Sequence, residues 1–227
     1  MDNQQGKPTR DPDLRLEAAR YALLRRLAHD LRHHMVAHLQ PIGLISEVME
    51  RRLHQDVPDP VALRENVARI RELSRAAVQS CLEVASWLAA EEDVGIALGA
   101  GVDECVSLLQ GSLGFQGFRL NNTTAGELFP VARTGLRHVL PACLLAITDR
   151  VASPCEVLLS AQTDAERATL TLRVQAMQAA AGSPQQAPYR VLQWHEVELL
   201  AQAEGFELTH TDEWVYVQMP AANARSA

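Results

Sequence analysis

The chain has few aromatic residues, no paired cysteines, no surplus of basic residues and no long apolar run. Phe, Trp and Tyr make up only 4% of its 227 residues, while alanine and leucine are abundant, which favours helix. The cysteines are scattered and form no CxxC pair, so we expect reduced, mostly buried thiols rather than a disulfide framework or a cysteine zinc site. These cysteines are Cys81, Cys105, Cys143 and Cys155.

The net charge and the hydropathy of the chain argue against two classes of partner, nucleic acid and membrane. A net charge of −7 argues against a general nucleic-acid surface. The longest apolar run, near Val139–Ile147, is far shorter than a membrane span. The first thirteen residues are polar and contain no apolar signal region. We therefore expect a cytoplasmic chain with no membrane and no nucleic-acid partner, large enough for one large domain or two small ones.

A heptad-like pattern predicts one long helix from about Asp13 to Leu53–Gln55. Its apolar and histidine residues alternate at spacings of three and four for nearly four heptads, which makes a continuous seam. Pro41 lies within this pattern and is expected to bend the helix, because it lacks an N–H and crowds the preceding turn. The seam consists of Leu24, Leu27, Leu31, His34, His38, Ile42, Ile45 and Met49.

A second helix is predicted from about residue 60 to residue 90, after a compact turn at residues 56–60. Asp59 is a good N-cap and Pro60 a good first helical residue. The second helix repeats the seam, so the two helices form an antiparallel hairpin. The seam of the second helix consists of Leu63, Val67, Ile70, Ser74, Ala77, Cys81, Val84 and Leu88. Within one hairpin the apolar seam of each helix can pack only against the other helix. Two hairpins related by a two-fold axis form a four-helix bundle, in which the seams pack together. The sequence therefore predicts a homodimer.

After residue 93 glycine becomes frequent and helices alternate with strands. Helices followed by strands in hairpins indicate an α+β fold of two domains. The predicted organisation is a disordered tail (1–11), a helical dimerisation domain (12–93), an α/β domain (94–220) and a second tail (221–227). The α/β domain is expected to hold helices at 102–113, 134–150 and 191–204 and strands at 118–122, 155–162, 168–174, 206–210 and 214–219.

Four histidines lie within ten residues of the first helix: His29, His33, His34 and His38. On a helical wheel His34 and His38 fall within roughly 20° of Leu27, so they face the seam, whereas His29 lies about 200° away and points outward. The i, i+4 pairs of these histidines could share a zinc ion, but the sequence shows no third ligand and no HExxH motif. We therefore expect no metal site, and an ordinary surface histidine remains the alternative for His29.

The order of elements and the run His29-Asp30-Leu31-Arg32 resemble the core of a bacterial sensor histidine kinase. The resemblance covers roughly residues 14–219. It implies a dimerisation and histidine-phosphotransfer domain followed by an ATP-binding domain, with His29 as phosphoryl acceptor and Asp30 assisting. One departure is that the proline common five residues after that histidine is His34 here.

The residues that bind nucleotide in that family are missing. Ala142 and Ala146 stand where the resemblance places asparagines, and alanine offers no oxygen to a hard cation. Residues 175–182 lack the family's Asp-x-Gly-x-Gly loop, and residues 188–193 lack its glycine-rich phosphate loop. We therefore expect no ATP cofactor. The chain resembles most nearly the dimeric histidine phosphotransferases with a degenerate ATP-binding domain, which relay phosphoryl groups between receiver domains and take Mg²⁺ from the receiver.

The leading hypothesis is a phosphorelay protein in which His29 carries the phosphoryl group. A neutral imidazole can attack the acyl phosphate of a partner's aspartate, and Asp30 could hydrogen-bond the ring or accept its proton. Two alternatives are a non-catalytic dimeric adaptor that binds a response regulator or kinase, and an active kinase with unorthodox nucleotide binding. Residues expected to contact the phosphoryl group or an acidic receiver surface are Arg25, Arg26, Arg32 and His33.

Overall fold

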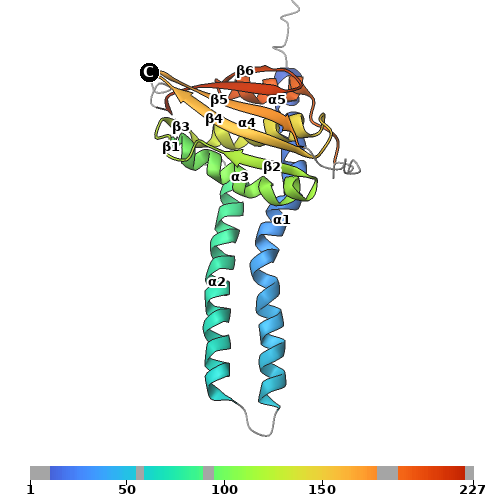
Figure 1. Ribbon diagram of the computed structural model, residues 1–227, viewed down its shortest axis with the longest axis vertical. Coiled ribbons are helices and arrows are strands. Elements are labelled where there is room, and N and C mark those ends of the chain that lie inside the picture. Colours follow the sequence, from blue (N-terminus) through green and yellow to red (C-terminus); the bar gives the residue numbers. More distant parts are fainter. Residues whose placement is uncertain (1–10, 55–58, 89–94, 178–188, 223–227) are drawn as a thin grey trace, which may run out of the picture. The chain divides into compact units, whose positions relative to one another are not determined.

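The computed structural model of the chain divides it into two compact units (Figure 1). The hairpin unit is Ala28–Glu91, and the α/β unit combines Met1–Leu27 with Glu92–Ala227. The helix α1 (Asp11–Leu53) contributes to both units. The prediction differs here, because it assigned all of residues 12–93 to the helical domain. The structure describes residues 11–54, 59–88, 95–177 and 189–222.

The chain has the predicted α+β class, with helices followed by a mixed sheet. Most of the two predicted tails (residues 1–10 and 223–227), the predicted boundary at residue 93 and most of the predicted turn at 56–60 lie outside the described residues. Asp11, which was assigned to the first tail, is the first residue of α1. In chain order the elements are α1 (Asp11–Leu53), α2 (Pro60–Leu88), β1 (Gly95–Ala97), α3 (Leu98–Phe115), β2 (Phe118–Asn122), β3 (Pro130–Ala132), α4 (Arg133–Thr148), β4 (Cys155–Thr163), β5 (Arg167–Ala176), α5 (Trp194–Ala203), β6 (Glu207–His210) and β7 (Trp214–Pro220).

In the hairpin unit, α2 begins where the sequence predicts. The carboxylate of Asp59 accepts hydrogen bonds from the backbone N–H groups of Val61 and Ala62, at 2.9 and 3.3 Å, which satisfies two N–H groups that have no partner within the helix. The helix α1 continues through Pro41. The described seam residues of α1 are buried or half-buried, as predicted, but Val67 in the seam of α2 is exposed. The seam of this unit is therefore only partly covered.

A five-stranded sheet in the order β2-β4-β5-β7-β6 organises the α/β unit. Only β2 and β4 run parallel, and the other neighbouring strands are antiparallel. Helices α3, α4 and α5 pack on one face of the sheet (Figure 1). Buried side chains alternate with more exposed ones along β4, β5 and β7, as expected for a sheet with one packed face.

Two short strands were missed, and one helix begins later than predicted. Strands β1 and β3 form a separate antiparallel pair of three residues each, which is too short to show a periodic pattern. The helix α5 begins at Trp194 because Glu196 accepts a hydrogen bond from the backbone N–H of Gln193, at 2.9 Å. Gly205 follows the helix with a φ of 66°, as expected for a glycine after a helix end. Of the helices in the described part of the chain, none has the length and apolarity that crossing a bilayer requires.

Candidate functional site

The side chain of His29 is exposed on α1, as the helical wheel predicts. Nη2 of Arg32, one turn later, lies 3.3 Å from Nδ1 of His29. A guanidinium can only donate, so Nδ1 is the acceptor in this contact. His33 is exposed as well. Nucleophilic attack needs the lone pair of a ring nitrogen. Attack through Nδ1 therefore requires the Arg32 contact to open, and attack through Nε2 requires the tautomer with its proton on Nδ1.

The other residues of the histidine cluster occupy different environments. Asp30 is only 7% exposed, although it follows the exposed His29 directly. His38 is half-buried, in keeping with its predicted place in the seam, and the side chain of His34 lies outside the described residues. Within the described part of the chain, no three or more His, Cys, Asp or Glu side chains are grouped so as to hold a metal ion.

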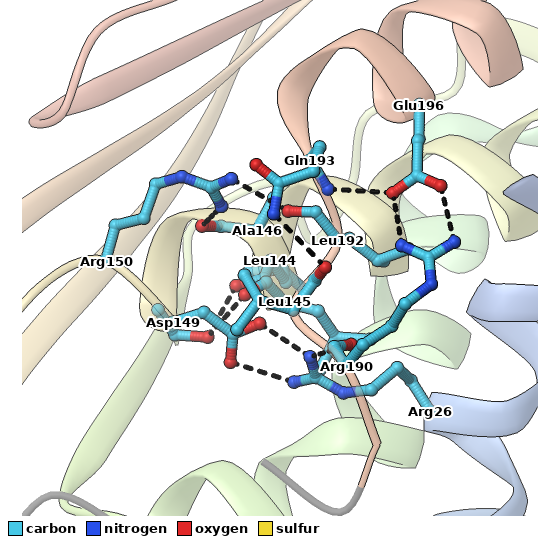
Figure 2. A network of polar contacts seen from close by, with 12 residues as sticks. Arg26, Leu144, Leu145, Ala146, Asp149, Arg150, Arg190, Leu192, Gln193 and Glu196 are labelled. Carbon is cyan, nitrogen blue, oxygen red and sulfur yellow. Dashed lines mark hydrogen bonds and ion pairs between the residues drawn. The ribbon is translucent and has the colours of Figure 1, made fainter. Parts of the chain in front are cut away.

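Arg26 lies in the interior of the α/β unit, which corrects the prediction that it reaches a partner or a phosphoryl group. It is 3% exposed, and its guanidinium donates to both carboxylate oxygens of Asp149 at 2.6 and 2.9 Å (Figure 2). It also donates to the backbone oxygen of Arg190 at 3.3 Å. The reason is that the first part of α1 packs within the α/β unit, so this face of the helix is covered.

Arg25, in contrast, is exposed. The centre of its guanidinium lies 5.3 Å from the centroid of the Tyr189 ring, which is a cation–π distance. Tyr189 was not among the residues predicted from sequence, because no local pattern links it to a helix more than 160 residues earlier.

Ala142 and Ala146, at the positions where the resemblance places asparagines, are on α4. Ala142 and Ala146 are each 0% exposed. The backbone oxygen of Ala146 accepts a hydrogen bond from the Arg150 guanidinium at 2.5 Å. These two side chains offer neither an oxygen ligand nor an exposed surface.

The segment before α5 is held by side chains of the α/β unit (Figure 2). Arg150 donates to the backbone oxygen of Leu192 at 2.8 Å, and Arg26 donates to that of Arg190. The Arg190 guanidinium forms two hydrogen bonds with Glu196, at 2.7 and 2.5 Å. The resemblance places a glycine-rich phosphate loop at this segment. In this chain the segment before α5 is ordered by hydrogen bonds from side chains of the protein itself.

Replacing Glu196 by glutamine tests how much this network stabilises the α/β unit. The hydrogen bond from Arg190 holds the pKa of Glu196 below its ordinary value, although burial opposes the shift. A lowered carboxyl pKa stabilises the fold above the ordinary pKa near 4.5, and this contribution disappears as the pH falls through the lowered value. We expect Glu196→Gln to lower the free energy of unfolding by about 1–2 kcal/mol at pH 7 and by much less near pH 3.

Urea unfolding of both proteins at the two pH values measures this difference. The matched control is Glu207→Gln, which removes the partner of Arg167 in an exposed ion pair. An exposed pair contributes at most about 0.5–1 kcal/mol. A pH-independent loss in Glu196→Gln would show that its charge is not what stabilises the segment.

Comparison with known proteins found solved structures that are similar to this chain in fold. No protein-family profile and no curated protein matches the sequence. Among solved structures, the catalytic domain of the histidine kinase ThkA is similar, with a TM-score of 0.45, 10% identity and coverage of 58% of this chain and 97% of that chain. A histidine kinase from Burkholderia phymatum STM815 has a TM-score of 0.39, 18% identity and coverage of 94% and 98%. A bacterial phosphotransferase has a TM-score of 0.36, 16% identity and coverage of 94% and 100%.

Proposed function

We propose that this chain is a histidine phosphotransferase of a two-component phosphorelay, with His29 as the phosphoryl carrier. The observation that carries the proposal is an exposed imidazole in the run His29-Asp30-Leu31-Arg32, with an arginine beside its ring nitrogen. A phosphoryl carrier needs an accessible nucleophile and a nearby cation, and this part of α1 supplies both.

The proposed reaction is a reversible exchange between two acceptors. A lone pair of the His29 imidazole attacks the phosphorus of an aspartyl phosphate on a receiver domain. A P–N bond forms, the acyl P–O bond breaks, and the receiver's carboxylate leaves. The reverse reaction returns the group to another aspartate. Mg²⁺ is expected on the receiver domain.

The neighbours of His29 have distinct proposed roles. Arg32 is close enough to the ring to neutralise charge on a phosphoryl group attached there. His33 and Arg25 are exposed and could contact the partner. The buried Asp30 is proposed to orient the ring or accept its proton, as the resemblance implies.

We further propose that ATP is not the phosphoryl donor. Ala142 and Ala146 lack the oxygens that a Mg²⁺–triphosphate requires, and both are fully buried. The segment at the position of the phosphate loop is already hydrogen-bonded to Arg26 and Arg150. These features support a protein that receives its phosphoryl group from another protein.

A homodimer through the hairpin unit is the proposed assembly. Large apolar side chains remain exposed on both helices of this unit, and a second hairpin would cover them in a four-helix bundle. Sedimentation should give a dimer at micromolar concentration, and Leu44→Glu should shift it towards monomer while Arg51→Glu should not. A wild-type monomer would contradict the assembly. The exposed apolar residues are Val36, Leu39, Leu44, Leu53, Val61, Val67, Val78 and Leu82.

The function is tested by incubating the protein with receiver domains that carry a labelled aspartyl phosphate. We expect label to appear on this chain in an acid-labile, base-stable form, as phosphohistidine behaves. Binding of a phosphorylated receiver without transfer of label would instead support the non-catalytic adaptor.

A further inference from the structure

The surface of α1 around the exposed Arg25 carries positive charge in an acidic protein. Of the four arginines between Glu17 and Glu47, Arg25 and Arg32 are exposed, whereas Arg26 is buried against Asp149 and Arg20 is paired with Glu17 and Glu204. The one acidic residue in this stretch of the sequence is Asp30. Asp30 is 7% exposed, so its negative charge contributes little to the electrostatic potential at the helix surface. The net charge of the whole chain is −7. A local positive surface on an otherwise negative molecule attracts an acidic partner and orients its approach.

Two exposed residues precede His29 at helical spacing. Tyr21 is 58% exposed, and Arg25 is exposed one turn later. Tyr21 and Arg25 are four residues apart, so they lie one turn apart on α1, about 40° from each other around the helix axis.

Tyr189 adds a second aromatic ring to this surface. It comes from the segment before α5, and its ring lies 5.3 Å from the Arg25 guanidinium. That segment is held in place through Arg190, whose side chain pairs with Glu196 and whose backbone oxygen accepts a bond from Arg26. The ring is therefore attached to a fixed support. Tyrosine and arginine are among the residue types that contribute most to binding at protein interfaces.

We propose that Tyr21, Arg25 and Tyr189 form a docking patch for the acidic face of a receiver domain. The proposal rests on the proposed function, and it concerns recognition of the partner rather than the chemistry at His29. A receiver's phosphorylated aspartate lies beside the carboxylates that hold its Mg²⁺, so the surface around it is acidic. Arg25 matches this charge, and the two tyrosines supply apolar contact area with a hydroxyl at the rim.

The patch is tested by measuring phosphoryl transfer as a function of receiver concentration. Tyr21→Ala and Tyr189→Ala should each raise the apparent KM about 5–30-fold and leave the rate at saturation within about twofold. Tyr21→Phe should retain most of the affinity, because the ring remains. The matched control is Leu14→Ala, another exposed apolar residue of α1 at 63%, which should have no effect. An unchanged KM in both alanine variants would overturn the patch.

A binding measurement separates the patch from the carrier role of His29. Receiver domains of the source organism are titrated against the His29→Gln variant, which retains the patch but cannot carry the group. Weaker binding after adding Tyr21→Ala or Tyr189→Ala supports the patch, even if the wild type accepts no label and the proposed function fails. Absence of binding to every receiver overturns the patch. Thermal unfolding of each variant checks that the α/β unit remains folded.

Discussion

Replacing His29 by glutamine is expected to abolish the acceptance of label from a phosphorylated receiver, with a loss on the order of 10³-fold or more. Glutamine keeps a polar side chain of similar length but has no ring nitrogen to form the P–N bond. Because His29 is exposed, the substitution should leave stability nearly unchanged. The measurement is the initial rate of label transfer at saturating receiver, with unfolding curves for both proteins.

The matched control is His33→Gln, because His33 is also exposed and lies one turn away on the same helix. We expect its transfer rate to stay within about threefold of the wild type. Arg32→Ala should lie between the two, with a loss of about 10–100-fold, since it removes a charge-assisted contact but retains the nucleophile. Full activity in His29→Gln together with loss in His33→Gln would move the carrier to His33.

The second large effect is expected for Arg26→Ala. This substitution leaves the carboxylate of Asp149, itself 9% exposed, without its two-bond partner in the interior of the α/β unit. Breaking a buried ion pair from one side typically costs about 3–5 kcal/mol, because the remaining charge is uncompensated. We expect a loss of this size in the free energy of unfolding. The double variant Arg26→Met/Asp149→Leu should recover most of it, because both charges are gone.

Tryptophan fluorescence can follow this unit alone. In a Trp87→Phe background the remaining tryptophans, Trp194 and Trp214, both belong to the α/β unit. The control is Arg25→Ala, which removes an exposed arginine from the adjacent position and should cost less than about 1 kcal/mol. Equal losses in Arg25→Ala and Arg26→Ala would mean that the Asp149 pair contributes little.

Local patterns in the sequence predicted much of this architecture. The spacing of apolar residues predicted both long helices, and Asp59 marked the start of the second through its capping carboxylate. Alternation of apolar and polar residues predicted β4, β5 and β7, because the sheet has one packed face. The same periodicity separated the outward His29 from the half-buried His38.

The wrong prediction for Arg26 shows which contacts local sequence patterns do not predict. An arginine beside Arg25 was expected to share its charged surface, yet its partner Asp149 is 123 residues away in the chain. The seam of α1 continues without a break from Leu24 to Leu31, so periodicity gives no sign that the helix passes from one compact unit to the other. The contact between Arg25 and Tyr189 is equally non-local. Only the folded chain brings these residues together.

The central claim is that this chain receives its phosphoryl group from another protein and not from ATP. The most direct test offers the same protein labelled ATP with Mg²⁺ in one reaction and a labelled, phosphorylated receiver domain in another. We predict label on His29 from the receiver and none from ATP, because Ala142 and Ala146 provide no oxygen ligands. Label on this chain from ATP, with none from any receiver, would contradict the claim.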